Sequence, residues 1–203
     1  MFTELKEAIK EVEDGDHELV MADECLFNQK HVVKNTWSTK GKNVTPRVML
    51  KHQGCIAAVG AISAKSGLIH TALFPKSVKG PTFLEFVRGL RQKKEGVIYL
   101  LLDNASIHKT KVVREYCDKN EIRLVWNVPY CPQFNGIEEY WAIAKKMFKR
   151  RILAQLLGAE AQRKIEETVQ ECLDRVPHAP TVKVAGRAQA MVRGQKACPR
   201  WGQ

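Results

Sequence analysis

The segment GVIYLLLDNASIH, residues 96–108, contains six consecutive apolar residues, Val97 to Leu102, and then Asp103 and Asn104. An unbroken apolar run of this length is typical of a strand that is buried on both faces of a sheet. A carboxylate at the end of such a strand is costly unless it is paired or holds a metal ion. Asp103 is therefore a candidate site residue, and the alternative is a helix cap or turn residue.

Strands and helices alternate around this segment. Strands are expected over residues 18–24, 54–63, 67–74 and 122–126, and helices over 2–13, 82–94, 110–120, from about 136, and over 154–176. This order favours a mixed α/β sheet with helices on both faces. Asp103 then lies at the carboxyl end of a central strand, where α/β sheets place their ligands.

Length and composition suggest one main domain, because 203 residues with 44% hydrophobic content can bury a sizeable core. We divide the chain into a short acidic helix at 1–17, an α/β domain at 18–176, and a basic tail at 177–203 that we expect to be disordered. The net charge is +11 although residues 1–26 hold nine acids and two lysines. The basic remainder indicates a nucleic-acid partner, and a solvated basic surface is the alternative.

Several protein classes are disfavoured by the sequence. No apolar run approaches the ~18 residues of a membrane span, so we expect no membrane partner. The charged N-terminal stretch lacks the features of a secretory signal. The cysteines form no C-x-x-C pair, which argues against a zinc ribbon. An intracellular protein is expected, in the nucleus of a eukaryote or the cytoplasm or nucleoid of a bacterium.

Three acidic positions can meet at one edge of the expected sheet. These are Asp23 at the end of the first strand, Asp103, and a glutamate of NGIEEYW, residues 135–141. Carboxylates suit Mg²⁺ or Mn²⁺, and two such ions ~4 Å apart clamp the attacking and leaving oxygens of a phosphodiester. The sequence therefore indicates metal-dependent chemistry on nucleic acid.

Helical periodicity chooses between the two adjacent glutamates. With a step of about 100° per residue, the core face consists of Ile137, Tyr140, Trp141, Ala144 and Phe148. Glu138 then lies on the shoulder of that face, on the side of Lys145 and Lys149. Glu139 points away from the core with Lys146 and Arg150, and is expected to pair weakly with its helix neighbours.

Three segments together resemble the catalytic domain of DDE transposases of the mariner superfamily, nearest to the branch that includes bacterial insertion sequences. They are MADECLF at 21–27, LLLDNASIHKT at 100–110 and NVPYCPQFNGIEEYWAIAKKMFK at 127–149. Thirty-four residues separate Asp103 from Glu138, which fits the spacing of that family's last two acids. NTWSTKG at 35–41 and GAISAKSGLI at 60–69 look like its connecting strands, so the resemblance spans roughly residues 18–150.

The resemblance implies a ribonuclease H-like fold and DNA cleavage and strand transfer in cut-and-paste transposition. Asp23, Asp103 and Glu138 become the catalytic triad and the ligands of two Mg²⁺ or Mn²⁺ ions. The implied partners are the transposon ends and the target DNA, with a homodimer in the active complex. The runner-up activity is that of another ribonuclease H-like nuclease.

Other residues are candidates for supporting roles, each with a simpler alternative. Asn104 and His108 match the D-N-x-x-x-H pattern of the family, and we group Glu24 with them. Asn104 orients a carboxylate or contacts DNA, or else caps the next turn. His108 contacts phosphate or donates to an acid, or else makes a local hydrogen bond.

The basic run on the glutamate helix is a candidate DNA contact, with a solvated face as the alternative. It comprises Lys145, Lys146, Lys149, Arg150 and Arg151. Trp37 and Trp141 are expected in the core rather than on bases, and Tyr130 is expected to pack within its loop.

The chain departs from the family in two respects. Gly136 replaces the proline of the usual N-P-I-E. Family members carry helix-turn-helix domains that read the transposon ends ahead of the core, whereas here only a short helix is expected before the first catalytic strand. A fragment, half of a split reading frame or a domesticated remnant would have this organisation. A DNA-binding module without activity is therefore an alternative to the enzyme.

Overall fold

The computed structural model describes residues 2–15, 17–28, 40, 54–156, 158–160 and 163–194. Within them lies a five-stranded sheet with the order β3-β2-β1-β4-β5. The central strand β1 is antiparallel to β2 and parallel to β4. The strands are β1 Glu18–Asn28, β2 Cys55–Ser63, β3 Gly67–Pro75, β4 Ile98–Leu102 and β5 Ile122–Trp126. The predicted mixed sheet is confirmed.

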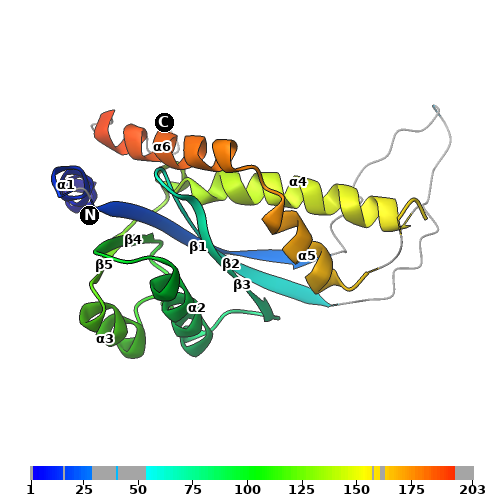
Figure 1. The fold of residues 1–203 in the computed structure, drawn as a ribbon, viewed down its shortest axis with the longest axis horizontal. Helices are drawn as coiled ribbons and strands as arrows, with labels where there is room; N and C mark the ends of the chain where they lie inside the picture. The colour runs from blue at the N-terminus through cyan, green and yellow to red at the C-terminus, as the bar shows by residue number, and fades with distance from the viewer. Residues whose placement is uncertain are drawn as a thin grey trace.

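Helices cover both faces of this sheet, as predicted (Figure 1). The helices α2 Gly80–Lys93 and α3 Lys111–Lys119 pack on one face. The core on the other face includes α1 Phe2–Asp14, α4 Ile137–Leu156, α5 Ile165–Asp174 and α6 His178–Gly194. None of the helices in the described ranges is long and apolar enough to cross a membrane.

The side chains of β1 and β4 alternate between the two cores. Odd-numbered residues contribute to the α4 side, and even-numbered residues contribute to the α2 side. The α4 side receives Leu19, Met21, Cys25, Phe27, Tyr99 and Leu101, and the α2 side receives Val20, Ala22, Ile98, Leu100 and Leu102. All five residues of β4 are buried, which explains its continuous apolar sequence.

The prediction of a disordered tail over 177–203 is wrong for residues 178–194, which form α6. The basic residues and the proline of this segment concealed apolar side chains at helical spacing. Val184, Ala188 and Val192, each four residues apart, are buried in the α4-side core. Pro180 lies in the first turn of the helix, where a missing N–H costs little.

Two other expectations need adjustment. The helix predicted from Ala154 does not begin there, because α4 continues to Leu156 and α5 starts at Ile165. Trp141 is buried at the core, as expected, whereas Trp37 and most of NTWSTKG lie outside the described residues.

The packing of α6 can be tested by Val184→Ala. Loss of two buried methyl groups should lower the free energy of unfolding by about 1.5–2.5 kcal/mol. The matched control is Lys183→Ala, because Lys183 is the exposed neighbour of Val184 on the same helix. Chemical denaturation of both variants measures the difference, and equal stabilities would mean that α6 does not pack on the domain.

Candidate active site

Strand register sets two carboxylates side by side. The parallel pairing of β1 with β4 ends at Met21 opposite Leu101. Asp23 and Asp103 each follow two residues later, so they lie at the same level, Asp23 within β1 and Asp103 directly after β4. Adjacent strands lie about 5 Å apart. The prediction that Asp23 ends its strand is wrong, because β1 continues to Asn28 along β2.

The loop before α4 is anchored to β1 directly beside Asp23. The Asn135 side chain donates from Nδ2 to the Ala22 carbonyl at 3.4 Å, and its Oδ1 accepts from the Ile137 N–H at 3.4 Å. The Gly136 N–H approaches the sulfur of Met21 at 3.2 Å. These contacts fix the first turn of α4, which carries Glu138, against the strand that carries Asp23.

Two glycines allow the close packing that places α4. Gly60 is the β2 partner of Asp23, and a Cβ there would lie 2.9 Å from the Trp141 ring. A Cβ on Gly136 would lie 2.8 Å from the Val184 carbonyl oxygen and 2.9 Å from Ala185 Cα. The proline of the family motif would meet the same α6 backbone, so glycine at 136 is a requirement of this packing.

Asp23, Asp103 and Glu138 line one hollow of about 410 Å³. Asn104, Asn127, Asn135 and the loop at 128–132 also contribute to its wall. The structure thus brings together the three acids that the sequence selected.

Glu139 does not line this hollow and instead pairs with Arg187 of α6 at 2.5 Å. The helix register behind the choice of Glu138 is confirmed, because every residue of the expected core face is buried. The expected pairing of Glu139 with its helix neighbours is wrong, since its partner lies on another helix.

The three acids influence one another electrostatically. Burial, together with the negative charges of Glu24, Glu138 and Asp103, raises the pKa of Asp23 to about 7. The Glu24 N–H, which donates to Asp23 Oδ1 at 2.7 Å, opposes this shift. A divalent cation would relieve this repulsion, and carboxylate oxygens are the ligands that Mg²⁺ and Mn²⁺ prefer. The donor set therefore fits such an ion, although among the described residues no three His, Cys, Asp or Glu side chains already converge on one point.

His108 lies fully buried between two acids. Its Nδ1 is 2.8 Å from Asp103 Oδ1, and its Nε2 is 3.0 Å from Glu24 Oε1. Burial lowers the pKa of His108, but the bonds to Asp103 and Glu24 outweigh it and raise the pKa to about 9. The ring is therefore an imidazolium at neutral pH, and its hydrogen bond is the main reason that the pKa of Asp103 is lowered.

The side chains of Glu24 and Asp23 lie on different faces of the sheet. As neighbours on β1, their side chains point to opposite sides, and Glu24 reaches His108 on the α2 side, where the imidazole packs on Phe83 with ring centroids 4.4 Å apart. His108 therefore lies within hydrogen-bonding distance of two acids, which is the geometry expected of a donor to an acid.

Asn104 connects the end of β4 to the loop after β5. Its Nδ2 donates to the Asn127 carbonyl at 2.8 Å, and its Oδ1 accepts from Lys109 Nζ at 2.8 Å. The Lys109 ammonium also lies over the Trp126 ring, 5.0 Å from its centroid. Asn104 therefore braces the wall of the hollow beside Asp103.

The predicted DNA-contacting residues of α4, namely Lys145, Lys146, Lys149 and Arg150, are all exposed. Burial raises the pKa of the Cys25 thiol to about 11; Lys145 opposes this shift, and Asp23 and Glu138 add to it. Lys145 therefore lies near the same thiol as the two acids, on the flank of α4 predicted from the sequence.

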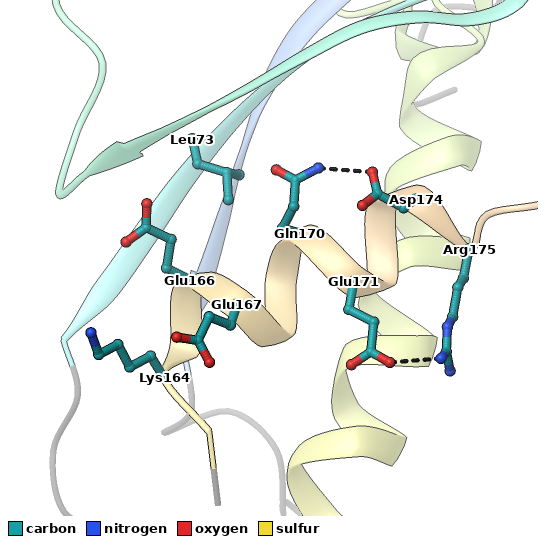
Figure 2. Close-up of a pocket in the computed structure, with 8 residues that line it drawn as sticks. All are labelled: Leu73, Lys164, Glu166, Glu167, Gln170, Glu171, Asp174 and Arg175. Carbon is teal, nitrogen blue, oxygen red and sulfur yellow. Dashed lines mark hydrogen bonds and ion pairs between the residues drawn. The ribbon is translucent and has the colours of Figure 1, made fainter.

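A second, larger hollow lies between β3 and α5 (Figure 2). Its charged lining is mainly acidic, with Glu166, Glu167, Glu171 and Asp174 against Lys164 and Arg175. Glu171 pairs with Arg175 at 2.8 Å, and Gln170 donates to Asp174 at 2.8 Å. This surface repels a polyanion and contains none of the predicted site residues.

Sequence reasoning missed the residues that shape the loop of the hollow. Asn127 and Asn135 are buried polar side chains, and their only signal was their position at the two ends of the proline-containing segment. Tyr130 was expected to pack within this loop, but its side chain is 90% exposed. That expectation is wrong.

Comparison with known proteins identifies the fold. The family model of the DDE superfamily endonucleases matches residues 18–156. The Mos1 transposase paired-end complex with the left transposon end has a TM-score of 0.64 and 15% identity, over 94% of this chain and 58% of that one. The Mos1 catalytic domain with raltegravir and Mn has a TM-score of 0.63 and 12% identity, over 95% of this chain and 88% of that one.

A simian T-cell lymphotropic virus intasome in complex with a PP2A regulatory subunit, B56 gamma, has a TM-score of 0.55 and 10% identity, over 91% of this chain and 57% of that one. The expected ribonuclease H-like fold is confirmed by these likenesses. No curated protein matches the chain. The chain spans 58% of the length of the Mos1 transposase in its paired-end complex.

The close approach of Gly136 to α6 predicts that Gly136→Ala lowers the free energy of unfolding by about 1–3 kcal/mol, the usual cost of overpacking. Gly186→Ala is the control, because a Cβ there meets only the Ala64 Cβ at 3.8 Å. Within helix α6 that change should be stabilising by about 0.5–1 kcal/mol. Thermal and urea unfolding distinguish the two, and equal effects would disprove the steric argument.

Proposed function

Because this chain belongs to the DDE superfamily endonucleases, we propose that it is a transposase catalytic core that cuts DNA and joins the cut end to a target. The observation that carries the proposal is the hollow shared by Asp23, Asp103 and Glu138. Phosphodiester chemistry needs clustered carboxylates to hold cations, and basic surface to hold the DNA backbone.

Asp23, Asp103 and Glu138 would hold Mg²⁺ or Mn²⁺, and we propose two ions. Solved Mos1 catalytic domains with Mn and with Mg support the choice of metal. When bound, the ions supply Lewis-acid activation of water or a 3′ hydroxyl and of the scissile phosphate. Glu24, Asn104 and His108 would support the acids without contacting the reacting atoms.

The protein's own part in this chemistry is orientation. Asp103 Oδ1 accepts from both His108 Nδ1 at 2.8 Å and the Ala105 N–H at 2.9 Å. Holding one oxygen in this way directs the other oxygen of the same carboxylate to the cation, as hydrogen-bonded partners of metal ligands generally do. The buried imidazolium of His108 also offsets part of the negative charge in the absence of metal.

The DNA partner is proposed to run along the exposed basic flank of α4, with Lys145 and Lys149 nearest the acids. Solved Mos1 structures include a paired-end complex with a transposon end and a strand transfer complex. They support DNA, with transposon ends, as the partner. Target DNA as the second substrate and a homodimer as the active unit are part of our proposal. The site of action would then be wherever the DNA lies, in a nucleus or a bacterial nucleoid.

The role of the acids is tested by nicking of plasmid DNA in Mn²⁺ or Mg²⁺. Asp103→Asn and Glu138→Gln should each reduce cleavage by about 100-fold or more, because a metal site contributes several kcal/mol of transition-state stabilisation. Glu139→Gln is the matched control and should retain activity. Loss of cleavage in Glu139→Gln alone would mean that the triad is wrongly assigned. Equal cleavage by wild type and Asp103→Asn would mean that the activity is a contaminant.

DNA binding without metal should be sequence-indifferent and salt-sensitive, because phosphate contacts dominate it. The double variant Lys145→Ala/Lys149→Ala should bind more weakly. The slope of log K against log salt should fall by about 0.9 for each phosphate that the variant no longer neutralises. The control Lys111→Ala removes a charge from α3, on the other face of the sheet, and should leave the slope unchanged. A duplex preference that persists at high salt would contradict this proposal.

A further inference from the structure

Tyr130 occupies a backbone position that tyrosine rarely adopts. The Cys131 N–H donates to the Val128 carbonyl at 3.2 Å, which closes a turn with Pro129 and Tyr130 at its centre. Tyr130 has φ +60°. Proline followed by a residue with positive φ is the pattern of a type II turn, whose third position favours glycine. A side chain at this position is therefore strained.

The Tyr130 side chain adds little packing that could offset this strain. Tyr130 is 90% exposed, whereas Tyr99 and Tyr140 are buried in the core. A tyrosine that stabilises a fold does so by burying its ring. Strained residues that add no packing are concentrated at functional sites, so the ring has to be explained by something that the chain binds.

The turn is held rigidly next to the acids. The Asn127 N–H donates to the Leu102 carbonyl at 2.8 Å, at the end of the strand that precedes Asp103. The buried Asn127 side chain accepts from the Val128 N–H at 2.9 Å and donates to the Cys131 carbonyl at 3.1 Å. Tyr130 also lines the same hollow as Asp103 and Glu138. The backbone of Tyr130 is thus held at the rim of the catalytic hollow, with its ring exposed.

We propose that Tyr130 stacks on an unpaired base of the DNA strand whose phosphate lies at the carboxylates. This inference rests on the proposed function. The hydroxyl of a tyrosine can donate to a phosphate oxygen, but only its ring offers a π face to a base that has left its pair. Bases inside an intact duplex are already stacked on both sides, so the ring selects DNA that is open at the site of cleavage.

The test measures binding of the full chain in EDTA to two DNAs, one a paired duplex and one with a single unpaired 2-aminopurine. Tyr130→Gly should bind the unpaired DNA about 5- to 100-fold more weakly, the range seen when a base–aromatic stack is removed. Its affinity for the paired duplex should be unchanged. The salt slope should also stay the same, because a stack releases no counterions. Tyr130→Phe should restore both the affinity and the quenching of 2-aminopurine fluorescence.

A folding defect does not confuse this test, because glycine suits φ +60° and should leave the melting temperature equal or higher. Equal affinity of Tyr130→Gly and wild type for the unpaired DNA would overturn the proposal. Equal losses on both DNAs would also overturn it, since the interaction would then be with the backbone. Absence of metal-dependent nicking by wild type would count against the proposed function, whereas the binding comparison in EDTA tests the stack separately.

Discussion

The gathering of three carboxylates, Asp23, Asp103 and Glu138, around one hollow is the constraint on which the rest of the site depends. Burial and the neighbouring negative charges raise the pKa of Asp23 to about 7, so the three acids come together only because the fold forces them to. Parallel register fixes Asp23 and Asp103 at one level, and the buried imidazolium of His108 compensates part of their charge. Such a site is predisposed to bind a cation, because the binding of a cation removes the repulsion that folding created.

Glu138 is brought to this site by packing on both sides of α4. On one side Trp141 lies over Gly60, and on the other side the α6 backbone lies against Gly136. Neither contact tolerates a Cβ without a shift of the backbone or the ring. Helix α6 therefore determines where α4 begins, although it lies outside the residues matched by the family model. This dependence also explains how the chain accommodates glycine where its family usually has proline.

Short sequence patterns predicted those parts of the fold that depend only on residues close together in the chain. The apolar run of β4, the core face of α4 and the choice of Glu138 all follow from periodicity, which requires only a few neighbouring residues. The contact of His108 with Glu24 joins residues 84 positions apart, and no short pattern carries that information. Helix α6 was missed because its lysine and two arginines suggested a solvated segment, whereas its buried face is made of small residues. Tyr130 was misjudged because aromatic residues are usually buried.

The distribution of charge indicates how DNA has to approach. The hollow itself is acidic, so phosphate can enter it only together with cations, whereas the flank of α4 that carries Lys145 is basic. The loop at 128–132, which also lines the hollow, presents a neutral ring. A strand that crosses the hollow would then have its backbone held on the α4 side and one base against Tyr130. Contacts to phosphate carry no sequence information, and stacking accepts every base. With the roles proposed for Lys145 and Tyr130, the site would recognise the opened state of the DNA rather than its sequence.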